Sequence, residues 1–382
     1  MSRPIRVAMV SASFYPYIGG AEKQALELSR ALAARGVLVS VLTRRVRGLP
    51  AREMISGLEV RRLAAWGKGL LNAATFMASL ALYLWRNSSS YDVVHAHLAG
   101  SPALAAALVG RWVGKPVIIK LGGGRGIGEL AASSRTAAGR AKLRLLAALR
   151  PRFAAVSADL AEELKDFGLG ACAVRVLANG VDVAAYRPAP ESGKSALRAR
   201  FGWPEGLGFL YVGRLSWEKR LPQFLEIWSR ARESAAAEAF VVLIGEGPER
   251  RTLEKLAARS EGRIILQEPT DAIASAYAAA DVFILPSISE GLSNSLLEAM
   301  ASGLGILASR VGGTVQAIED GKSGLLFDPE NREELSEKLK QIFSRPKMLG
   351  EMGLAARTSS VELYSIEQAA ARYEAFYREI LS

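Results

Sequence analysis

The sequence has few of the residues that build metal centres and covalent cross-links. Its 382 residues include one cysteine, Cys172, and two histidines, His95 and His97. A single cysteine excludes an intramolecular disulfide and a zinc site built on thiolates, and it suits a reducing compartment. No Asp-x-Asp, His-Glu-x-x-His or other metal-ligand spacing is present in the sequence. It therefore predicts chemistry that needs neither a metal ion nor a cofactor.

A hydrophobic run long enough to cross a membrane is also lacking. Residues 69–85 carry no charge, but this stretch of 17 residues is interrupted by Asn72, Thr75 and Ser79. A spanning helix needs about 20 mostly apolar residues, so the stretch predicts a buried or interfacial helix. The apolar run at the N-terminus is too short for a signal peptide. We therefore expect a cytoplasmic protein.

Acidic residues are scarce in the first half of the chain. Residues 1–190 hold 26 Lys and Arg against 11 Asp and Glu, the remainder holds 23 against 27, and the net charge is +11. Two clusters carry the excess: Arg44, Arg45, Arg47, Arg52, Arg61 and Arg62, and Arg135, Arg140, Lys142, Arg144, Arg150 and Arg152. This asymmetry predicts an anionic partner such as a phospholipid surface or a phosphorylated acceptor, although either cluster alone fits a solvated basic face equally well. Because no nucleic-acid-binding motif is visible, we do not expect a nucleic acid partner.

Short apolar runs alternate with helical patterns along the whole chain, which predicts an α/β protein. The expected strands are residues 5–10, 37–43, 92–96, 117–120, 153–156, 209–212, 239–245, 264–266, 282–285 and 305–309. The expected helices are residues 21–35, 70–86, 102–113, 158–167, 248–258, 272–280, a helix that ends at 302, and 366–381. Strands that are apolar on both faces are typical of parallel sheets covered by helices on each side.

A stretch that contains Pro, Gly and Ser, residues 186–208, interrupts this pattern and predicts a domain boundary. We expect two doubly wound, Rossmann-like domains, residues 1–190 and 191–360, that face a central cleft. Residues 361–382 form a C-terminal segment. Its helix packs either on the second domain or, by crossing back, on the first domain. Ligands of such sheets bind at the carboxyl ends of the strands, so the cleft is the expected site.

Glycine-rich loops follow two strands of the first domain. Gly19 and Gly20 precede the first helix, and residues 122–124 follow the strand 117–120. Glycine lets a ligand's phosphate approach the backbone N–H groups at the start of a helix. Each loop also fits a tight strand-to-helix turn, with Glu22 placed favourably at the dipole of the first helix.

Two cations follow the first strand of the second domain. Arg214 and Lys219 offer a planar guanidinium and a point charge, a combination that suits a diphosphate. The alternative is that these residues form a surface loop in which Lys219 pairs with Glu218 or another acid.

Two carboxylates follow the strand 282–285. Glu290 lies in the loop, and Glu298 would lie about 12 Å further along a helix. At that spacing they cannot act on one atom, but they can hold two parts of one long ligand. The alternative is that Glu298 caps its own helix, because residues 295–298 read Ser-Leu-Leu-Glu.

His95 and His97 close the strand 92–96 and, by pleat alternation, point to one face of the sheet. A general acid or base role and a place as hydrogen-bonded core histidines both remain open.

Taken in order, these residues resemble retaining nucleotide-sugar glycosyltransferases of family 4, which have the GT-B fold. The resemblance extends over nearly the whole chain. It rests on residues 19–22 (Gly-Gly-Ala-Glu), 92–97 (Asp-Val-Val-His-Ala-His), 179–182 (Asn-Gly-Val-Asp), 213–215 with Lys219, 245–248 (Gly-Glu-Gly-Pro), Glu290 with Glu298, and the pair Gly312 and Gly313.

The resemblance implies the roles of the site residues. Glu290, Arg214 and Lys219 would be catalytic, with the two cations holding the donor diphosphate and offsetting the charge on the leaving nucleotide. The implied donor-binding set is Gly19, Gly20, Arg214, Lys219, Glu290, Gly291, Leu292, Ser293 and Glu298, with Glu290 on sugar hydroxyls and Glu298 on the ribose. The implied acceptor side is His97, Lys120 and Gly122. No metal ligand is implied.

The chain departs from the family's pattern in two places. Many members carry a histidine near the donor sugar, where this chain has residues 121–124, Leu-Gly-Gly-Gly. Lys120, the glycine loop or a group of the acceptor is left to do that work. Gln316 stands where an acid commonly follows the glycine pair Gly312 and Gly313.

The implied reaction moves a sugar, of the hexosyl type, from a nucleoside-diphosphate sugar to an acceptor hydroxyl with retained anomeric configuration. We expect the acceptor to be a lipid-linked or cell-surface glycan and the protein to be peripheral on the inner face of the cytoplasmic membrane. The alternatives are a catalytically silent nucleotide-sugar-binding protein, which the absent histidine motivates, and a GT-B-like nucleotide-sugar epimerase.

Overall fold

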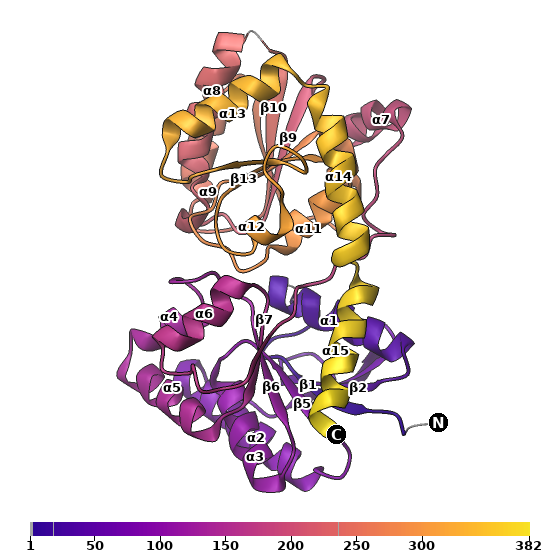
Figure 1. Cartoon of the computed structure of the whole chain (residues 1–382), viewed down its shortest axis with the longest axis vertical. Helices are drawn as coiled ribbons and strands as arrows, with labels where there is room; N and C mark the ends of the chain where they lie inside the picture. Colours follow the sequence, from indigo (N-terminus) through magenta and orange to yellow (C-terminus); the bar gives the residue numbers. More distant parts are fainter. Residues whose placement is uncertain (1–2, 18, 236) are drawn as a thin grey trace. The chain divides into compact units, whose positions relative to one another are not determined.

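The computed structural model describes residues 3–17, 19–235 and 237–382. The chain forms two compact units (Figure 1). The first unit comprises Met1–Gly180 and Ile366–Ser382, and the second comprises Val181–Ser365. The divisions therefore lie at 180/181 and 365/366, where the sequence predicted 190/191 and 360/361.

The described part of the first unit contains an eight-stranded sheet in the order β3-β4-β2-β1-β5-β6-β7-β8. Its strands are β1 (Arg6–Val10), β2 (Leu38–Arg44), β3 (Arg52–Ile55), β4 (Leu58–Leu63), β5 (Val93–His97), β6 (Val117–Leu121), β7 (Arg152–Ala155) and β8 (Val174–Val176). All neighbours are parallel except β3 and β4, which form an antiparallel hairpin. The strand order reverses direction between β1 and β5, which makes that point the topological switch of the sheet.

Helices cover this sheet: α1 (Gly20–Ala34), α2 (Gly69–Arg86), α3 (Ser101–Val113), α4 (Glu129–Ser134), α5 (Ala137–Leu149), α6 (Ala158–Asp166) and α15 (Ile366–Leu381). The central strands β5 and β6 are buried along their whole length. Because both faces of these strands are covered, most of their residues are apolar, and the exceptions His95, His97 and Lys120 are buried as well.

The last helix, α15, belongs to the first unit although it ends the chain. It packs against α1 and contributes Ile366, Tyr373 and Tyr377 to the core of that unit. Gly180 lies directly against this helix, because a Cβ at Gly180 would be 2.7 Å from the Cα of Ile366. Beside it, Val181 and Ser365 form an isolated parallel bridge. The chain therefore leaves and re-enters the first unit at the same place.

The described part of the second unit contains a six-stranded, fully parallel sheet in the order β11-β10-β9-β12-β13-β14. Its strands are β9 (Leu207–Val212), β10 (Ala239–Ile244), β11 (Ile264–Gln267), β12 (Val282–Leu285), β13 (Gly305–Ser309) and β14 (Leu325–Phe327). Its helices are α7 (Glu191–Phe201), the 3-10 helix η1 (Trp217–Lys219), α8 (Leu221–Ala235), α9 (Arg250–Ala257), α10 (Ile273–Ala279), α11 (Asn294–Ala301), α12 (Thr314–Ala317), α13 (Arg332–Ser344) and α14 (Met348–Leu363). The switch point of this sheet lies between β9 and β12.

Helix α7 occupies much of the stretch 186–208 that the sequence predicted as an interruption between domains. Among the described residues, no helix combines the length and the apolar character that crossing a bilayer requires.

Candidate active site

A buried tyrosine near the end of β9, Tyr211, holds the backbone that follows the strand. The hydroxyl of Tyr211 donates a hydrogen bond to the carbonyl oxygen of Arg214 at 2.8 Å. Gly213 between them has φ +154°, and a Cβ there would be 2.9 Å from this hydroxyl. Burial, with the charges of Glu290 and Glu218 nearby, raises the pKa of Tyr211 well above its usual value, so the tyrosine remains a donor. Gly213 and Tyr211 together fix where Arg214 stands at the strand end.

Lys219 meets Glu290 at the switch point of the second sheet. The Nζ of Lys219 lies 2.6 Å from the Oε1 of Glu290, and the Oγ of Ser287 donates to the same oxygen at 2.6 Å. The N–H of Ile288 donates to the carbonyl of Glu218 at 2.9 Å, which ties the loop after β9 to the loop after β12. Lys219 therefore pairs with an acid other than Glu218, and it does so at the strand ends where the sequence predicts the diphosphate.

The contacts of Glu290 involve one oxygen of its carboxylate. Among the described residues, both hydrogen bonds to this carboxylate end on Oε1. Glu290 itself is 8% exposed. Ser287 holds the carboxylate in place, and sequence reasoning missed it. The signal was available, because a hydroxyl three residues before an acid in a loop is positioned to hydrogen-bond that acid.

The glycine pair Gly312 and Gly313 packs against the backbone of the loop that carries Glu290. The N–H of Gly313 donates to the carbonyl oxygen of Gly291 at 2.6 Å. A Cβ at Gly312 would collide with the carbonyl oxygen of Glu290, and a Cβ at Gly313 would collide with that of Gly291. Gly312 also has φ +46°, a conformation that favours glycine. The two segments approach this closely only because both positions lack side chains.

Helix α11 begins one residue after its cap, Ser293. The Oγ of Ser293 accepts from the N–H of Leu296 at 3.4 Å, so Ser293 and not Ser295 is the N-cap. Glu298 lies in the second turn of the helix, and the alternative that it caps α11 is therefore wrong. This carboxylate is buried beside Tyr277 of α10, whose pKa is raised by burial and by the charge of Glu298. Glu298 is thus held inside the unit, close to the carboxyl edge of the sheet.

One side-chain donor at this edge, the guanidinium of Arg214, has no protein acceptor among the described residues. The Arg214 side chain is exposed, and within the described part of the chain it forms no ion pair or hydrogen bond. Leu292, in the loop that precedes α11, is buried, whereas the side chain of Arg214 is exposed. An unpaired guanidinium beside the Lys219–Glu290 pair makes an edge that can accept an anionic group and a neutral polyol side by side.

In the first unit, the glycine loops hold carboxylates of their own helices. The N–H of Gly19 donates to Glu22 at 3.1 Å. The N–H groups of Gly122 and Gly123 donate to the two carboxylate oxygens of Glu129, each at 3.1 Å. Gly20 starts α1 directly after Gly19. These contacts support the structural-turn alternative for both loops, because a phosphate would have to displace a carboxylate from each.

His95, His97 and Lys120 form a buried group in the first unit. Both histidines are covered, and their rings stack at 4.9 Å. The Nδ1 of His95 lies 2.6 Å from the hydroxyl of Tyr377 on α15. Burial, with Lys120 nearby, lowers the pKa of His95 to about 3. This is the core-histidine alternative for His95. His97 lies in the same core, and burial lowers its pKa well below the usual value.

Lys120 lies opposite His97 in the register of β5 and β6. Its Nζ lies 5.5 Å from the ring centre of Tyr373 on α15 and is buried without a hydrogen-bond acceptor among the described residues. Burial lowers the pKa of Lys120 to about 7. Of the acceptor-side residues expected from the sequence, His97 and Lys120 are therefore brought together, whereas Gly122 lies exposed in its loop.

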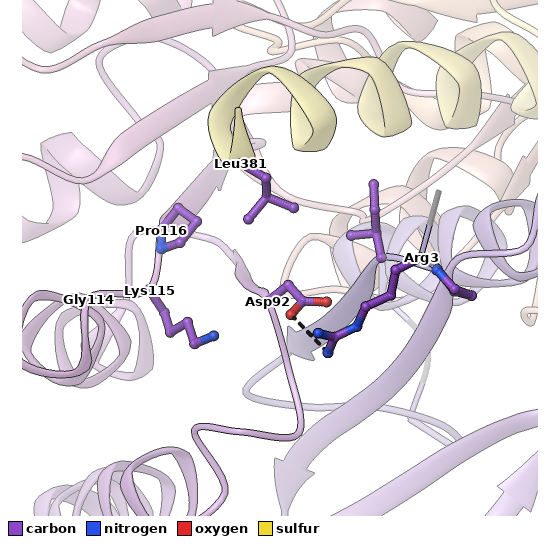
Figure 2. Close-up of a pocket in the computed structure, with 8 residues that line it drawn as sticks. Arg3, Asp92, Gly114, Lys115, Pro116 and Leu381 are labelled. Carbon is purple, nitrogen blue, oxygen red and sulfur yellow. Dashed lines mark ion pairs between the residues drawn. The ribbon is translucent and has the colours of Figure 1, made fainter. Parts of the chain in front are cut away.

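A separate cavity of about 310 Å³ lies at the amino-terminal edge of the first sheet (Figure 2). Two of its charged groups are paired, with the guanidinium of Arg3 lying 3.6 Å from the carboxylate of Asp92. This cavity is at the edge opposite the strand ends that carry the candidate residues. Across the described residues, no cluster of three His, Cys, Asp or Glu side chains is placed to hold a metal ion.

Comparisons with known proteins agree with this architecture. The sequence model described as Glycosyltransferase Family 4 matches residues 18–185, and the one described as Glycosyl transferases group 1 matches residues 194–359. D-inositol 3-phosphate glycosyltransferase of Nocardiopsis dassonvillei is 30% identical over 391 aligned residues, covering 92% of this chain and 90% of that protein. Sulfoquinovosyl transferase SQD2 of Arabidopsis thaliana is 34% identical over 187 residues, 48% of this chain and 36% of that protein.

Solved structures show the same fold at lower identity. Sucrose-phosphate synthase from Thermosynechococcus elongatus superimposes with a TM-score of 0.79 at 21% identity, covering 98% of this chain and 99% of that one. Anabaena HepE in complex with UDP and glucose gives 0.78 at 17% identity, with 98% and 100% coverage. The expected α/β class with two doubly wound sheets, the GT-B fold, is confirmed.

Proposed function

Since the chain belongs to the glycosyltransferases of group 1 and family 4, we propose that it is a retaining, metal-independent glycosyltransferase of the hexosyl type. It moves a sugar from a nucleoside-diphosphate sugar to an acceptor hydroxyl and releases the nucleoside diphosphate. The observation that carries this proposal is the meeting of Lys219 and Glu290 at the switch point of the second sheet, with Arg214 unpaired at the same strand end. The UDP and glucose in the Anabaena structure are the type of ligand that we propose here.

The roles follow from the charges. Arg214 binds diphosphate oxygens through its planar fork, and Lys219 adds a point charge between the diphosphate and Glu290. As the bond to the sugar breaks, negative charge grows on the leaving diphosphate, and these fixed cations stabilise it without a metal ion. Because the cations are in place before the reaction, little reorganisation is needed.

Glu290 orients the sugar. Its Oε1 is held by Lys219 and Ser287, which leaves Oε2 to accept a hydrogen bond from a sugar hydroxyl. Glu298 binds the ribose, and the backbone N–H groups of residues 291–293 face the sugar and the phosphate. Gly19 and Gly20 of the first unit admit the diphosphate once Glu22 gives up its contact with Gly19.

The proposed acceptor is a lipid-linked or cell-surface glycan, which the protein meets at the inner face of the cytoplasmic membrane. The excess of basic residues in the first half of the chain supports an anionic acceptor or surface. His97, Lys120 and Gly122 remain the proposed acceptor side, with the two buried side chains acting through the position of the loop after β6.

A silent nucleotide-sugar-binding protein is the second candidate. The observation that favours it is the loop at 122–124, which lacks a histidine and has its amides bonded to Glu129. Turnover with a panel of acceptors, followed by NMR of the anomeric proton of the product, separates the readings. A product with retained configuration supports the transferase, donor binding without turnover supports the silent protein, and a new nucleotide sugar formed without acceptor supports an epimerase.

The first test is a thermal-shift screen against UDP, GDP, ADP and their common sugar conjugates in EDTA. A ligand present at about 100 times its Kd stabilises a protein by about 2.7 kcal/mol, enough to raise the melting temperature measurably. We expect one nucleotide series to stabilise the wild type but not Arg214→Ala. Arg230→Ala, which removes an exposed arginine from α8, is the matched control and keeps the shift. If no nucleotide shifts the wild type at millimolar concentration, the donor site is refuted.

A further inference from the structure

Helix α2 exposes an apolar stripe to solvent. Leu71, Ala74, Ala78, Leu82 and Trp85 are all exposed, and their spacing of three or four residues puts them on one face of the helix. The opposite face, with Phe76, Leu80 and Leu84, is buried against the first unit. A surface helix normally has polar residues on its outer face, so a helix that is apolar on both faces points to a second contact.

The stripe continues onto α3. The rings of Trp85 and Trp112 stack with centroids 5.7 Å apart and an angle of 3° between their planes. Trp112 is 73% exposed, and Leu108 is exposed one turn before it. The other end of α2 is equally apolar, with Leu70 at 90% and Trp66 at 70% exposure. We call the exposed residues of α2 and α3, together with Trp66 and Lys68 just before α2, the α2–α3 face.

Only positive charge lies at this face. Neither α2 nor α3 contains an acidic residue. Lys68 precedes α2, Arg86 ends it, Arg111 lies next to Trp112, and all three are exposed. Within the described residues, none of the three forms an ion pair. The surface therefore combines tryptophan, leucine and unpaired cations.

We propose that the α2–α3 face docks on the surface of an anionic lipid bilayer, with α2 lying in the plane of the interface. Tryptophan and leucine enter the boundary between head groups and acyl chains, while lysine and arginine contact lipid phosphates. A second copy of the chain fits less well. In a symmetric pair, Lys68, Arg86 and Arg111 would face the same cations with no carboxylate on the face to pair with them.

The fold links this surface to the carboxyl edge of the first sheet. β4 ends at Leu63 at that edge, and α2 starts at Gly69 a few residues later. An 18-residue helix is about 27 Å long. Docking of α2 along its length therefore brings the edge that carries the loop at 122–124 close to the lipid head groups. This suits a lipid-linked acceptor, but the docking itself does not depend on the transfer reaction.

The test is vesicle co-sedimentation of the full chain without donor or acceptor. Vesicles are made of phosphatidylcholine alone or with phosphatidylglycerol at about a third of the lipid. We expect binding to the anionic vesicles only, and Trp85→Ser combined with Trp112→Ser to weaken it at least about tenfold. Leu354→Ser combined with Leu363→Ser removes two exposed apolar residues of the second unit and serves as the matched control with unchanged binding.

Charge is tested in the same assay. Lys68→Gln, Arg86→Gln and Arg111→Gln together weaken binding about a hundredfold, at about 1 kcal/mol per cation. Removing three charges at the end of α4 and in α5, with Arg135→Gln, Arg140→Gln and Arg144→Gln, has a smaller effect. Unchanged melting temperatures and nucleotide shifts show that each variant is folded.

Three results would overturn the proposal: no binding of the wild type to anionic vesicles, unchanged binding of the double tryptophan variant, or a dimer in solution that this variant abolishes. The nucleotide screen is independent of all three, so the docking surface and the transferase can fail separately.

Discussion

Lys120 shows how one buried residue sets the pH dependence of the first unit. The groups that face it are His95 and His97 of β5, Tyr373 of α15, and Glu27 of α1, whose charge opposes the effect of burial. Its pKa is lowered from 10.5 to about 7 in the folded chain. Between these values the unfolded chain binds one more proton than the folded chain, so the free energy of unfolding rises with pH.

We therefore predict that Lys120→Met flattens the pH dependence of stability. From pH 7 towards 10.5, the free energy of unfolding of the wild type rises by up to about 1.4 kcal/mol per pH unit relative to that of the variant. Below pH 7, the difference between the two free energies of unfolding is constant. Urea denaturation of both proteins at pH 6, 7, 8 and 9, monitored on the first unit, measures this difference. A difference that does not change with pH would mean that Lys120 is not neutral in the folded chain.

The glycine turn between β13 and α12 acts at the scale of an element, since it positions the loop that carries Glu290. In Gly313→Ala the new Cβ displaces the carbonyl of Gly291. A displacement of about 1 Å at a binding loop lowers kcat/KM about a hundredfold, and overpacking lowers stability by about 1–3 kcal/mol. Gly313 has φ −66°, so the effect is steric and not conformational.

The nucleotide-induced rise in melting temperature reports on this loop, and we expect Gly313→Ala to lose most of it. Gly350→Ala is the control, because Gly350 lies in α14 with no atom near the position of a Cβ. Alanine there improves helix propensity by about 1 kcal/mol and leaves the loop alone. An intact nucleotide shift in Gly313→Ala would show that the turn does not support the site.

Elements with strong apolar periodicity could be predicted from the sequence, and those with mixed polarity could not. The buried strands β5, β6, β10 and β12 read directly from their Val and Ile content. The hairpin of β3 and β4 was missed because β3 has only four residues, begins with two charged ones and contains no buried residue. Helix α7 is polar and short, so its residues predicted a domain boundary and not a helix.

The site was predictable to the level of the strand edge. Doubly wound topology places Lys219 and Glu290 after neighbouring strands, although they are 71 positions apart. Their direct contact, and the support from Ser287, depend on loop conformations that periodicity does not describe. The same limit applies to Glu129, the first residue of α4, whose carboxylate accepts hydrogen bonds from the N–H groups of Gly122 and Gly123.

At the scale of the whole molecule, the last helix completes the first unit. Tyr373, Phe376 and Tyr377 of α15 lie in the core of that unit, and Tyr377 supplies the hydrogen-bond partner of His95. Without α15, this apolar surface and a buried histidine are exposed to water. The second unit, Val181–Ser365, has its own sheet and core and loses none of them.

We therefore predict that a chain ending at Ser365 keeps a folded second unit and loses the first. Limited proteolysis should cleave the first unit rapidly, while the second unit resists and keeps its nucleotide-induced rise in melting temperature, since Arg214, Lys219 and Glu290 all lie within it. Vesicle docking and sugar transfer are both lost, because both need the first unit. Removal of Leu381 and Ser382 alone, which are exposed and lie beyond Tyr373 and Tyr377, is the control and leaves all four properties unchanged. A first unit that resists protease without α15 would show that this helix covers the core without being needed to form it.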